Sequence, residues 1–232
     1  MRNLAIIPAR SGSKGLPDKN IKLLNGVPLL AYSIKAAQES GMFDEIMVST
    51  DSKKYADIAM QYGASVPFLR SKELSGDSAG SWDVVMEVLR CYQKLGSVFD
   101  TVCLLQPTSP LRTADDIIAG YELLKCKCAD AVTSVCEAEH SPLWCMTLGE
   151  DLSLSEFNKR DEDRPRQQLP TYYRLNGALY IRKIAYDEGN IMICHKNEFA
   201  LIMPRDRSID IDVLFDFLYA EQILKAISDR KY

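Results

Sequence analysis

Two patterns of hydrophobic positions take turns along the first 136 residues: short continuous apolar runs, and longer segments in which apolar residues recur at helical spacing. Short and almost wholly apolar runs predict strands at residues 3–8, 45–50, 65–69, 101–105 and 131–136. Between these runs, apolar side chains recur every three to four positions, which predicts helices at 28–40, 52–62, 81–95 and 114–125. Repeated strand–helix alternation is typical of an α/β protein with a mostly parallel sheet and helices on both of its faces.

The regular alternation ends after about residue 138. Residues 150–170 are charged and irregular, strand patterns return at 177–181 and 200–203, and an amphipathic helix is expected from about 213 to 227. We therefore expect a single domain over residues 1–232, in which residues 139–182 form an excursion from the main sheet. Asp51 precedes the second helix, where an acidic side chain caps a helix more often than it binds a ligand.

Composition and charge exclude several classes of protein. The chain has 232 residues, of which 47% are hydrophobic, which favours one substantial core over disorder. The formal net charge of -4 and the lack of a basic block argue against a nucleic-acid partner. No apolar run approaches the roughly 20 residues that a membrane-spanning helix needs. The first strand begins too early to leave room for a signal peptide, so we expect a cytoplasmic protein without a membrane partner.

Seven cysteines are present, an odd number with no C-x-x-C pair. Together with the absence of a secretion signal, this indicates reduced and mostly buried thiols. Cys126 and Cys128 are two positions apart and could in principle hold a metal, but two unrelated cysteines at a helix end are the favoured interpretation.

The first strand leads directly into a loop rich in glycine, serine and basic residues. Residues 9–20 read ARSGSKGLPDKN and carry Arg10, Lys14 and Lys19. Small residues let backbone N–H groups approach an anion, and the cations neutralise it. The segment contains neither G-x-x-x-x-G-K-[ST] nor G-x-G-x-x-G. Because open α/β sheets bind ligands at the carboxyl ends of their strands, the loop predicts a triphosphate site.

A second polar loop follows the strand at 101–105. It carries Gln106 just before the first of two prolines, Ser109 between them and Arg112 after them. Its place at the carboxyl end of a strand puts it on the same sheet edge as the first loop. A rigid turn with a surface arginine would explain this segment alone, but two such loops on one edge favour a shared cleft.

Asp210 and Asp212 form the third candidate. Side chains two positions apart on an extended segment point to the same face, so both carboxylates could bind one Mg²⁺ ion. Alternatively, Asp212 caps the last helix and Asp210 is exposed. Spacing alone leaves both interpretations open, and a nearby triphosphate would favour the metal site.

These segments, taken in order, resemble the acylneuraminate cytidylyltransferase family, whose members are also called CMP-sialic acid or CMP-nonulosonic acid synthetases. The matching stretches are IPARSGSKGLPDKN, LLQPTSPLR, PRQQLP, RLNGALY and SIDID, which run from residue 7 to residue 212. The resemblance implies a three-layer Rossmann-like nucleotidyltransferase fold and a homodimer with a small exchanged element, which residues 139–182 would form. It also implies transfer from CTP to a nonulosonic acid, giving a CMP-sugar and pyrophosphate, with Mg²⁺ or Mn²⁺ as cofactor.

The resemblance further implies roles for individual residues. The nucleotide-binding set comprises Ala9, Arg10, Ser13, Lys14, Lys19, Asn20, Arg70, Asp77, Ala79 and Ser81. The sugar-acid set comprises Gln106, Ser109, Arg112, Arg166, Arg174 and Tyr180, of which the last three line the pocket or come from the neighbouring subunit. Asp210 and Asp212 would hold the metal, and with Arg10 and Lys19 they form the catalytic set.

Two departures from the family pattern concern the substrate. Relatives that use sialic acid often have a lysine where this chain has Trp144, and paired aromatic residues where it has the aliphatic segment 190–193. The substrate could therefore be legionaminic or pseudaminic acid as well as N-acetylneuraminic acid. A catalytically silent nucleotide-binding relative is the alternative from a different class, and no general base is assigned.

Overall fold

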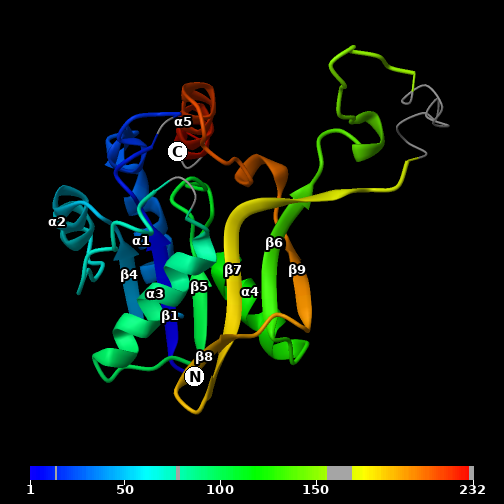
Figure 1. Ribbon diagram of the computed structural model, residues 1–232. Coiled ribbons are helices and arrows are strands. Elements are labelled where there is room, and N and C mark those ends of the chain that lie inside the picture. Colours follow the sequence, from blue (N-terminus) through cyan, green and yellow to red (C-terminus); the bar gives the residue numbers. More distant parts are fainter. Residues whose placement is uncertain (14, 77–78, 156–168, 230–232) are drawn as a thin grey trace.

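A computed structural model describes residues 1–13, 15–76, 79–155 and 169–229 (Figure 1). Its centre is a seven-stranded sheet in the order β4-β1-β5-β7-β6-β9, with β8 paired to β7. The strands of this sheet are β1 (Asn3–Pro8), β4 (Glu45–Ser49), β5 (Thr101–Leu104), β6 (Ala131–Glu137), β7 (Tyr173–Asp187), β8 (Asn190–Ile193) and β9 (Glu198–Ile202).

The sheet is mixed, although most of its strands share one direction. β1 pairs in parallel with β4 and β5, and β6 pairs in parallel with β9. Among the described strands of this sheet, β7 alone runs the opposite way, because its pairings with β5, β6 and β8 are all antiparallel. The predicted α/β class is confirmed, and the reversed strand places the start of β7 at the edge where β1 and β5 end.

Helices cover both faces of the sheet, which gives three layers. Helices α1 (Leu29–Ser40), α2 (Lys53–Gln61) and α4 (Ala114–Cys126) pack with Ala5 and Ile7 of β1 in one core. Helix α3 (Ser81–Lys94) packs with Leu4 and Ile6 in the other core, on the opposite face (Figure 1). Alternate residues of a strand point to opposite faces, so a strand such as β1, which is apolar from residue 4 to residue 8, fills both cores at once.

A third, smaller core lies over the carboxyl edge of the sheet. Helix α5 (Leu214–Asp229) packs there with the short hairpin of β2 (Leu23–Leu24) and β3 (Val27–Pro28). Its buried residues are Leu16, Leu24, Leu29, Ile211, Phe217 and Ala220. This core joins the segment after the first strand to the segment before the last helix, and so brings residues 9–20 beside residues 208–212. Three short 3₁₀ helices, Lys19–Ile21, Pro142–Trp144 and Arg205–Arg207, complete the described elements.

Two local predictions need correction. Ser52, not Asp51, caps α2, because its side chain accepts the backbone N–H of Tyr55. The strand expected at 65–69 is reduced to one bridge between Ser65 and Met47. Pro67 follows, and since proline has no N–H to donate, the chain leaves the sheet there.

The excursion expected at 139–182 only partly leaves the sheet. We call the described residues 138–155 and 169–172 the arm; they extend away from the body of the molecule in Figure 1. Residues 173–182 instead belong to β7 in the middle of the sheet. Apolar side chains on and beside the arm are solvent-exposed, including Leu148 and Leu175. Its role in dimerisation stays a prediction.

All seven cysteines are free, as expected, but the expectation that most are buried is wrong. Cys103 and Cys136 are buried, whereas Cys126, Cys128 and Cys145 are exposed. In the described part of the chain, no helix is both long and apolar enough to cross a membrane.

Candidate functional site

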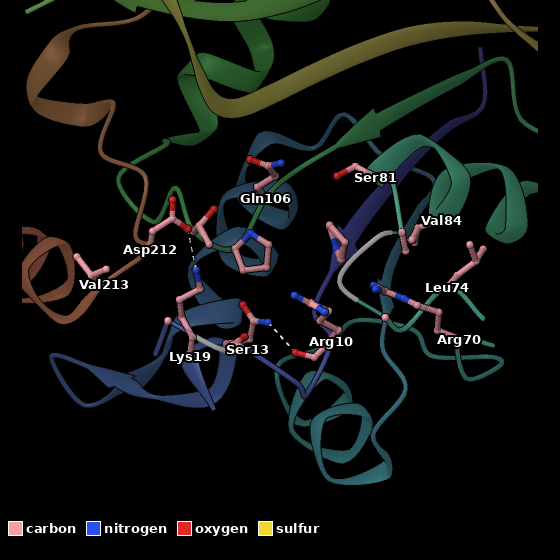
Figure 2. A pocket seen from close by; sticks show the side chains of 17 residues that line it. Arg10, Ser13, Lys19, Arg70, Leu74, Ser81, Val84, Gln106, Asp212 and Val213 are labelled. Carbon is pink, nitrogen blue, oxygen red and sulfur yellow. Dashed lines mark hydrogen bonds and ion pairs between the residues drawn. The ribbon is translucent and has the colours of Figure 1, made fainter. Parts of the chain in front are cut away.

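A cavity of about 450 Å³ opens where β1 and β5 end, and we call it the first cavity (Figure 2). It is lined from three directions: by the loop after β1, by the stretch that leads into α3, and by the loop after β5. Nine of the predicted site residues line it: Arg10, Ser13, Lys19, Asn20, Arg70, Ala79, Ser81, Gln106 and Asp212. Lys14, Asp77 and Arg166 lie outside the described residues.

The loop of residues 9–20, which we call the nucleotide loop, is closed on itself. Asn20 Nδ2 donates a hydrogen bond of 3.1 Å to the carbonyl oxygen of Arg10, drawn in Figure 2. Ala9 is fully buried, and its N–H donates to the carbonyl of Ser49. Ala9 therefore extends the pairing of β1 with β4 and supports the loop from below, while Arg10 and Lys19 reach the cavity.

The nucleotide loop touches the segment that carries the two aspartates. Lys19 Nζ donates to the carbonyl of Ile211 at 2.5 Å and lies 3.2 Å from Asp212 Oδ1. A Cβ atom at Gly15 would come within 2.6 Å of the carbonyl oxygen of Asp212, so only glycine fits there. The first cavity therefore combines Arg10 and Lys19 with one carboxylate.

The other end of the first cavity is set by Arg70. Its Nε donates to Ser49 Oγ at 3.0 Å and its Nη2 to the Ser49 carbonyl at 2.6 Å. Burial lowers the pKa of this guanidinium, which is 8% exposed. Arg70 is thus a fixed donor group beside the apolar side chains of Leu74 and Val84. Leu74 belongs to the stretch from Arg70 to Ser81 that resembles the family's cytidine-recognition segment, whereas sequence reasoning missed Val84, which carried only the signal of a core helix position.

Gly177, in the first part of β7, lies close to side chains of the loop after β5. It has a φ of +74°, and an added Cβ would lie 2.5 Å from Gln106 Oε1 and 3.5 Å from Asp210 Oδ2. The absence of a side chain at this position lets Gln106 and Asp210 approach each other across the β7 backbone. The sequence contained this residue in the RLNGALY stretch without indicating its place in the site.

The prediction that Ser109 and Arg112 bind substrate is contradicted by their burial. Arg112 Nη1 donates to the Ala178 carbonyl at 2.8 Å and its Nη2 to Ser33 Oγ at 2.5 Å. Burial lowers the pKa of Arg112 to about 10. Ser109 is fully buried and donates to the Asn176 carbonyl. Neither is among the described residues that line a cavity at this edge; they hold the loop after β5 against α1 and β7.

A second cavity, of about 790 Å³, is lined in part by residues 208–210. Its lining is Glu139, Arg174, Arg205, Asp206, Ser208, Ile209, Asp210, Phe215, Asp216 and Tyr219. Arg174 Nη2 donates to the carbonyl of Ser208, which fixes the guanidinium beside the aspartate segment. Tyr180 is half-buried and packs edge-to-face on Trp82, with the ring centroids 6.4 Å apart, and it is not among the described lining residues.

The two aspartates face different cavities but interact. Asp210 lines the second cavity and Asp212 the first. Asp210 is exposed as a residue, but the protein around its carboxylate reduces hydration, which raises its pKa; a hydrogen bond from Thr108 lowers the pKa, and the nearby charge of Asp212 raises it further, with a net upward shift. Of the alternative in which Asp212 caps the last helix and Asp210 is exposed, the second half is confirmed, because Asp210 is exposed. At the start of α5 it is the Asp216 carboxylate that accepts backbone N–H groups, those of Asp212 and Val213.

Trp144 and segment 190–193, the two departures from the family pattern, are not among the described residues that line either cavity. Strand β8, residues 190–193, pairs with residues 184–187 of β7, at the opposite end of that strand from Gly177. Trp144 is in the 3₁₀ helix of the arm. The bearing of segment 190–193 on the choice of substrate therefore stays a prediction.

Fold and cavity together define a nucleotide-binding α/β protein with cations at the carboxyl edge of its sheet. Comparison with known families is more specific: the cytidylyltransferase family model matches residues 4–143. The chain belongs to this family.

Curated relatives extend the likeness over nearly the whole chain. The chain is 38% identical to the CMP-N,N'-diacetyllegionaminic acid synthase of Legionella pneumophila over 97% of both proteins. It is 35% identical to the pseudaminic acid cytidylyltransferase of Campylobacter jejuni, again over 97% of both. It is 38% identical to the N-acylneuraminate cytidylyltransferase of Streptococcus agalactiae, over 94% of this chain and 52% of that protein.

Solved structures support the fold. A CMP:2-keto-3-deoxy-manno-octonic acid synthetase in complex with CTP superposes with a TM-score of 0.69, covering 97% of this chain and 99% of that one at 14% identity. A 4-diphosphocytidyl-2C-methyl-D-erythritol synthase from Anaerococcus prevotii gives a TM-score of 0.58, also at 14% identity, over 97% and 98% of the two chains. The Rossmann-like nucleotidyltransferase fold is thereby confirmed.

Proposed function

We propose that this protein is a cytidylyltransferase that joins CTP to a nonulosonic acid and releases pyrophosphate. One observation carries the proposal: a single short segment, residues 208–213, contributes to the lining of two cavities, with Asp212 in the first and Asp210 in the second. A transfer between two substrates needs two adjoining sites, so that the reacting groups are held next to each other.

CTP occupies the first cavity in this proposal. Arg10 and Lys19 neutralise the triphosphate, and the cytosine lies at the Arg70 end, near Ala79 and Ser81. Because Ser49 fixes one edge of the Arg70 guanidinium, the remaining N–H groups are aimed in one direction. They match the acceptor atoms O2 and N3 of cytosine, which favours a pyrimidine with that acceptor pattern.

The sugar acid occupies the second cavity, with its carboxylate toward Arg174, and its hydroxyl groups reach toward Gln106, which lines the first cavity. The anomeric hydroxyl oxygen attacks the α-phosphorus, a new P–O bond forms, and the bond to the β-phosphate breaks so that pyrophosphate leaves. The chain's own contribution is to position both substrates and to stabilise charge, as in other phosphoryl-type transfers. The names of the three relatives specify three different nonulosonic acids at similar identity, so the proposal is made for the class.

We further propose that Asp210 and Asp212 hold Mg²⁺ or Mn²⁺. The fit rests on two interacting carboxylates, of which Asp210 has a raised pKa because of desolvation and, in part, because of the charge of Asp212. Within the described residues there is no cluster of three or more potential protein ligands. Mg²⁺ typically takes one or two carboxylates and completes its shell with water and substrate phosphates, so two aspartates suffice. When bound, such an ion neutralises phosphate charge and makes the attacking hydroxyl more acidic.

The protein is proposed to act as a homodimer in the cytoplasm. The arm and its root leave large apolar side chains exposed, among them Leu148, Leu152, Tyr173 and Leu175. Extended apolar surface of this kind is typical of an interface between protein chains. The exchanged-element interpretation of residues 139–182 rests on this surface and on the family resemblance.

The test is pyrophosphate release from CTP and Mg²⁺ with legionaminic, pseudaminic and N-acetylneuraminic acids in turn. We expect release with one acid and none without it. Asp210→Asn should abolish turnover while the protein stays folded, whereas Asp115→Asn, an exposed carboxylate on α4, should leave turnover unchanged. Near wild-type turnover in folded Asp210→Asn would remove the metal assignment. CTP binding without release for any acid would favour the catalytically silent relative.

A further inference from the structure

The nucleotide loop is held from outside by the residues around the start of α2. Asp51 Oδ1 accepts the backbone N–H of Ser11 at 2.9 Å, and Asp51 Oδ2 accepts the Ser11 hydroxyl, also at 2.9 Å. Both contacts are partly buried. Because Ser52 caps the helix, the Asp51 carboxylate is available for this contact, although its position in the sequence resembles that of a capping residue.

The same segment holds the far end of the loop. The Tyr55 hydroxyl donates to Asp18 Oδ1 at 2.9 Å, and Lys54 Nζ lies 3.9 Å from Asp18 Oδ2. Asp18 has a φ of +53°, a left-handed conformation that costs energy for a residue with a side chain. This turn starts the 3₁₀ helix that carries Lys19 and Asn20 to the cavity. Residues 51–55, which lead into the first turn of α2, therefore contact the loop on both sides of its glycine-rich part.

The chemistry of Asp51 argues against direct contact with the nucleotide. It is not among the described residues that line the first cavity. A carboxylate beside a triphosphate repels it, but here both carboxylate oxygens are already taken up by Ser11. Ser11 lies between Arg10 and Ser13, both of which line the cavity. Fixing Ser11 thus fixes the direction of its neighbours.

We propose that Asp51 is a positioning residue for nucleotide binding, which acts through Ser11 to hold the nucleotide loop in its binding conformation. The inference rests on the proposed binding of CTP in the first cavity. A loop of glycines and serines gains more conformational freedom when released than other sequences do, and that freedom is lost again on binding. Ordering the loop before CTP arrives increases affinity without adding a contact to the ligand.

Two substitutions at Asp51 separate positioning from charge. Asp51→Ala removes both acceptors, and we expect the Kd for Mg·CTP in titration calorimetry to rise about tenfold. Asp51→Asn keeps both contacts, because the amide oxygen accepts the Ser11 N–H and the amide nitrogen donates to the Ser11 hydroxyl oxygen. It should restore affinity to within about twofold of wild type. The KM for CTP should follow the Kd, whereas the KM for the sugar acid should stay unchanged.

Matched variants identify the partner of Asp51. Ser11→Ala loses only the hydroxyl contact and should cost less affinity than Asp51→Ala, and adding it to Asp51→Ala should cost nothing more. Asp57→Ala removes an exposed carboxylate on the same helix and should bind as wild type does. Wild-type affinity in Asp51→Ala would overturn the proposal. An equal loss in Asp51→Asn would also overturn it, since the charge itself would then matter.

Amide hydrogen exchange tests the same inference without nucleotide. In the unliganded protein, exchange of the Ser11 N–H should be at least about tenfold faster in Asp51→Ala than in wild type, and unchanged in Asp57→Ala. Unchanged exchange in Asp51→Ala would overturn the proposal even if CTP binds. Failure of the wild-type protein to bind CTP, by contrast, would contradict the proposed function and leave the exchange result to decide on Asp51.

Discussion

Replacing Gly177 with alanine should damage substrate binding more than it damages stability. The residue has a φ of +74°, and its missing side chain makes room for Gln106 Oε1, which would lie 2.5 Å from an added Cβ. Carbon–oxygen contacts of this length do not persist, so one of the two groups has to move. Because the Gln106 amide is the far end of a flexible side chain, it moves more easily than the β7 backbone does.

The size of each effect follows from this geometry. A left-handed backbone costs alanine about 1 kcal/mol relative to glycine, which lowers Tm by roughly 2–4 °C in a domain of this size. To reach a separation of about 3 Å or more, Gln106 has to shift by roughly half an ångström or more, away from the position in which it lines the first cavity. Misplacements of this order cost about tenfold or more in binding or rate.

Gly189 supplies the matched control. It has a φ of +85° in the turn between β7 and β8, with no atom within 4 Å of an added Cβ. Gly177→Ala and Gly189→Ala should therefore lose similar stability in thermal unfolding. Only Gly177→Ala should raise the KM for the sugar acid, by about tenfold in pyrophosphate-release assays. Equal kinetics in the two variants would refute the claim that Gly177 makes room for Gln106.

Three further predictions concern the core, the thiols and the arm. Arg112→Leu should destabilise the fold by about 3 kcal/mol in urea unfolding, because it leaves Ser33 Oγ and the Ala178 carbonyl without their donor. The KM values of the folded variant should stay within about twofold of wild type. A selective rise in one KM would instead indicate that Arg112 belongs to the substrate site. Burial raises the pKa of Cys103 to about 12. Its thiol should therefore react with an alkylating reagent at pH 8 only after unfolding, as read by mass spectrometry, and modification in the native protein would contradict its burial. Leu175→Asp should shift a sedimenting dimer toward monomer, and a wild-type monomer at micromolar concentration would exclude the proposed interface.

Apolar runs predicted much of the fold, because a strand buried on both faces has apolar residues at nearly every position. Strand β1 fills a core on each face and is apolar at every position after Asn3, so its place was evident. Strand β7 was predicted only at 177–181, since Tyr173 and Leu175 of its first part are exposed and alternate with polar residues. The strand expected at 65–69 was apolar as well, but Pro67 removes a hydrogen-bond donor that the sheet requires.

The part of the candidate site that follows the carboxyl ends of strands was predictable from the sequence. Arg10, Lys19 and Gln106 follow β1 and β5 and line the first cavity, as a shared sheet edge requires. Sequence alone does not show which way a loop side chain points, so buried Arg112 looked the same as a substrate ligand. The contact of Asp51 with Ser11 was not evident from the sequence, because a carboxylate just before a helix is also the usual sign of a helix cap.

The most direct test of the central claim is to identify the products of the reaction. Purified protein is incubated with CTP, Mg²⁺ and each nonulosonic acid, and the mixture is analysed by mass spectrometry and ³¹P NMR. Attack on the α-phosphorus predicts a CMP ester of one acid and pyrophosphate in equal amounts. Formation of CDP with inorganic phosphate, or of CMP without an ester, would contradict the account.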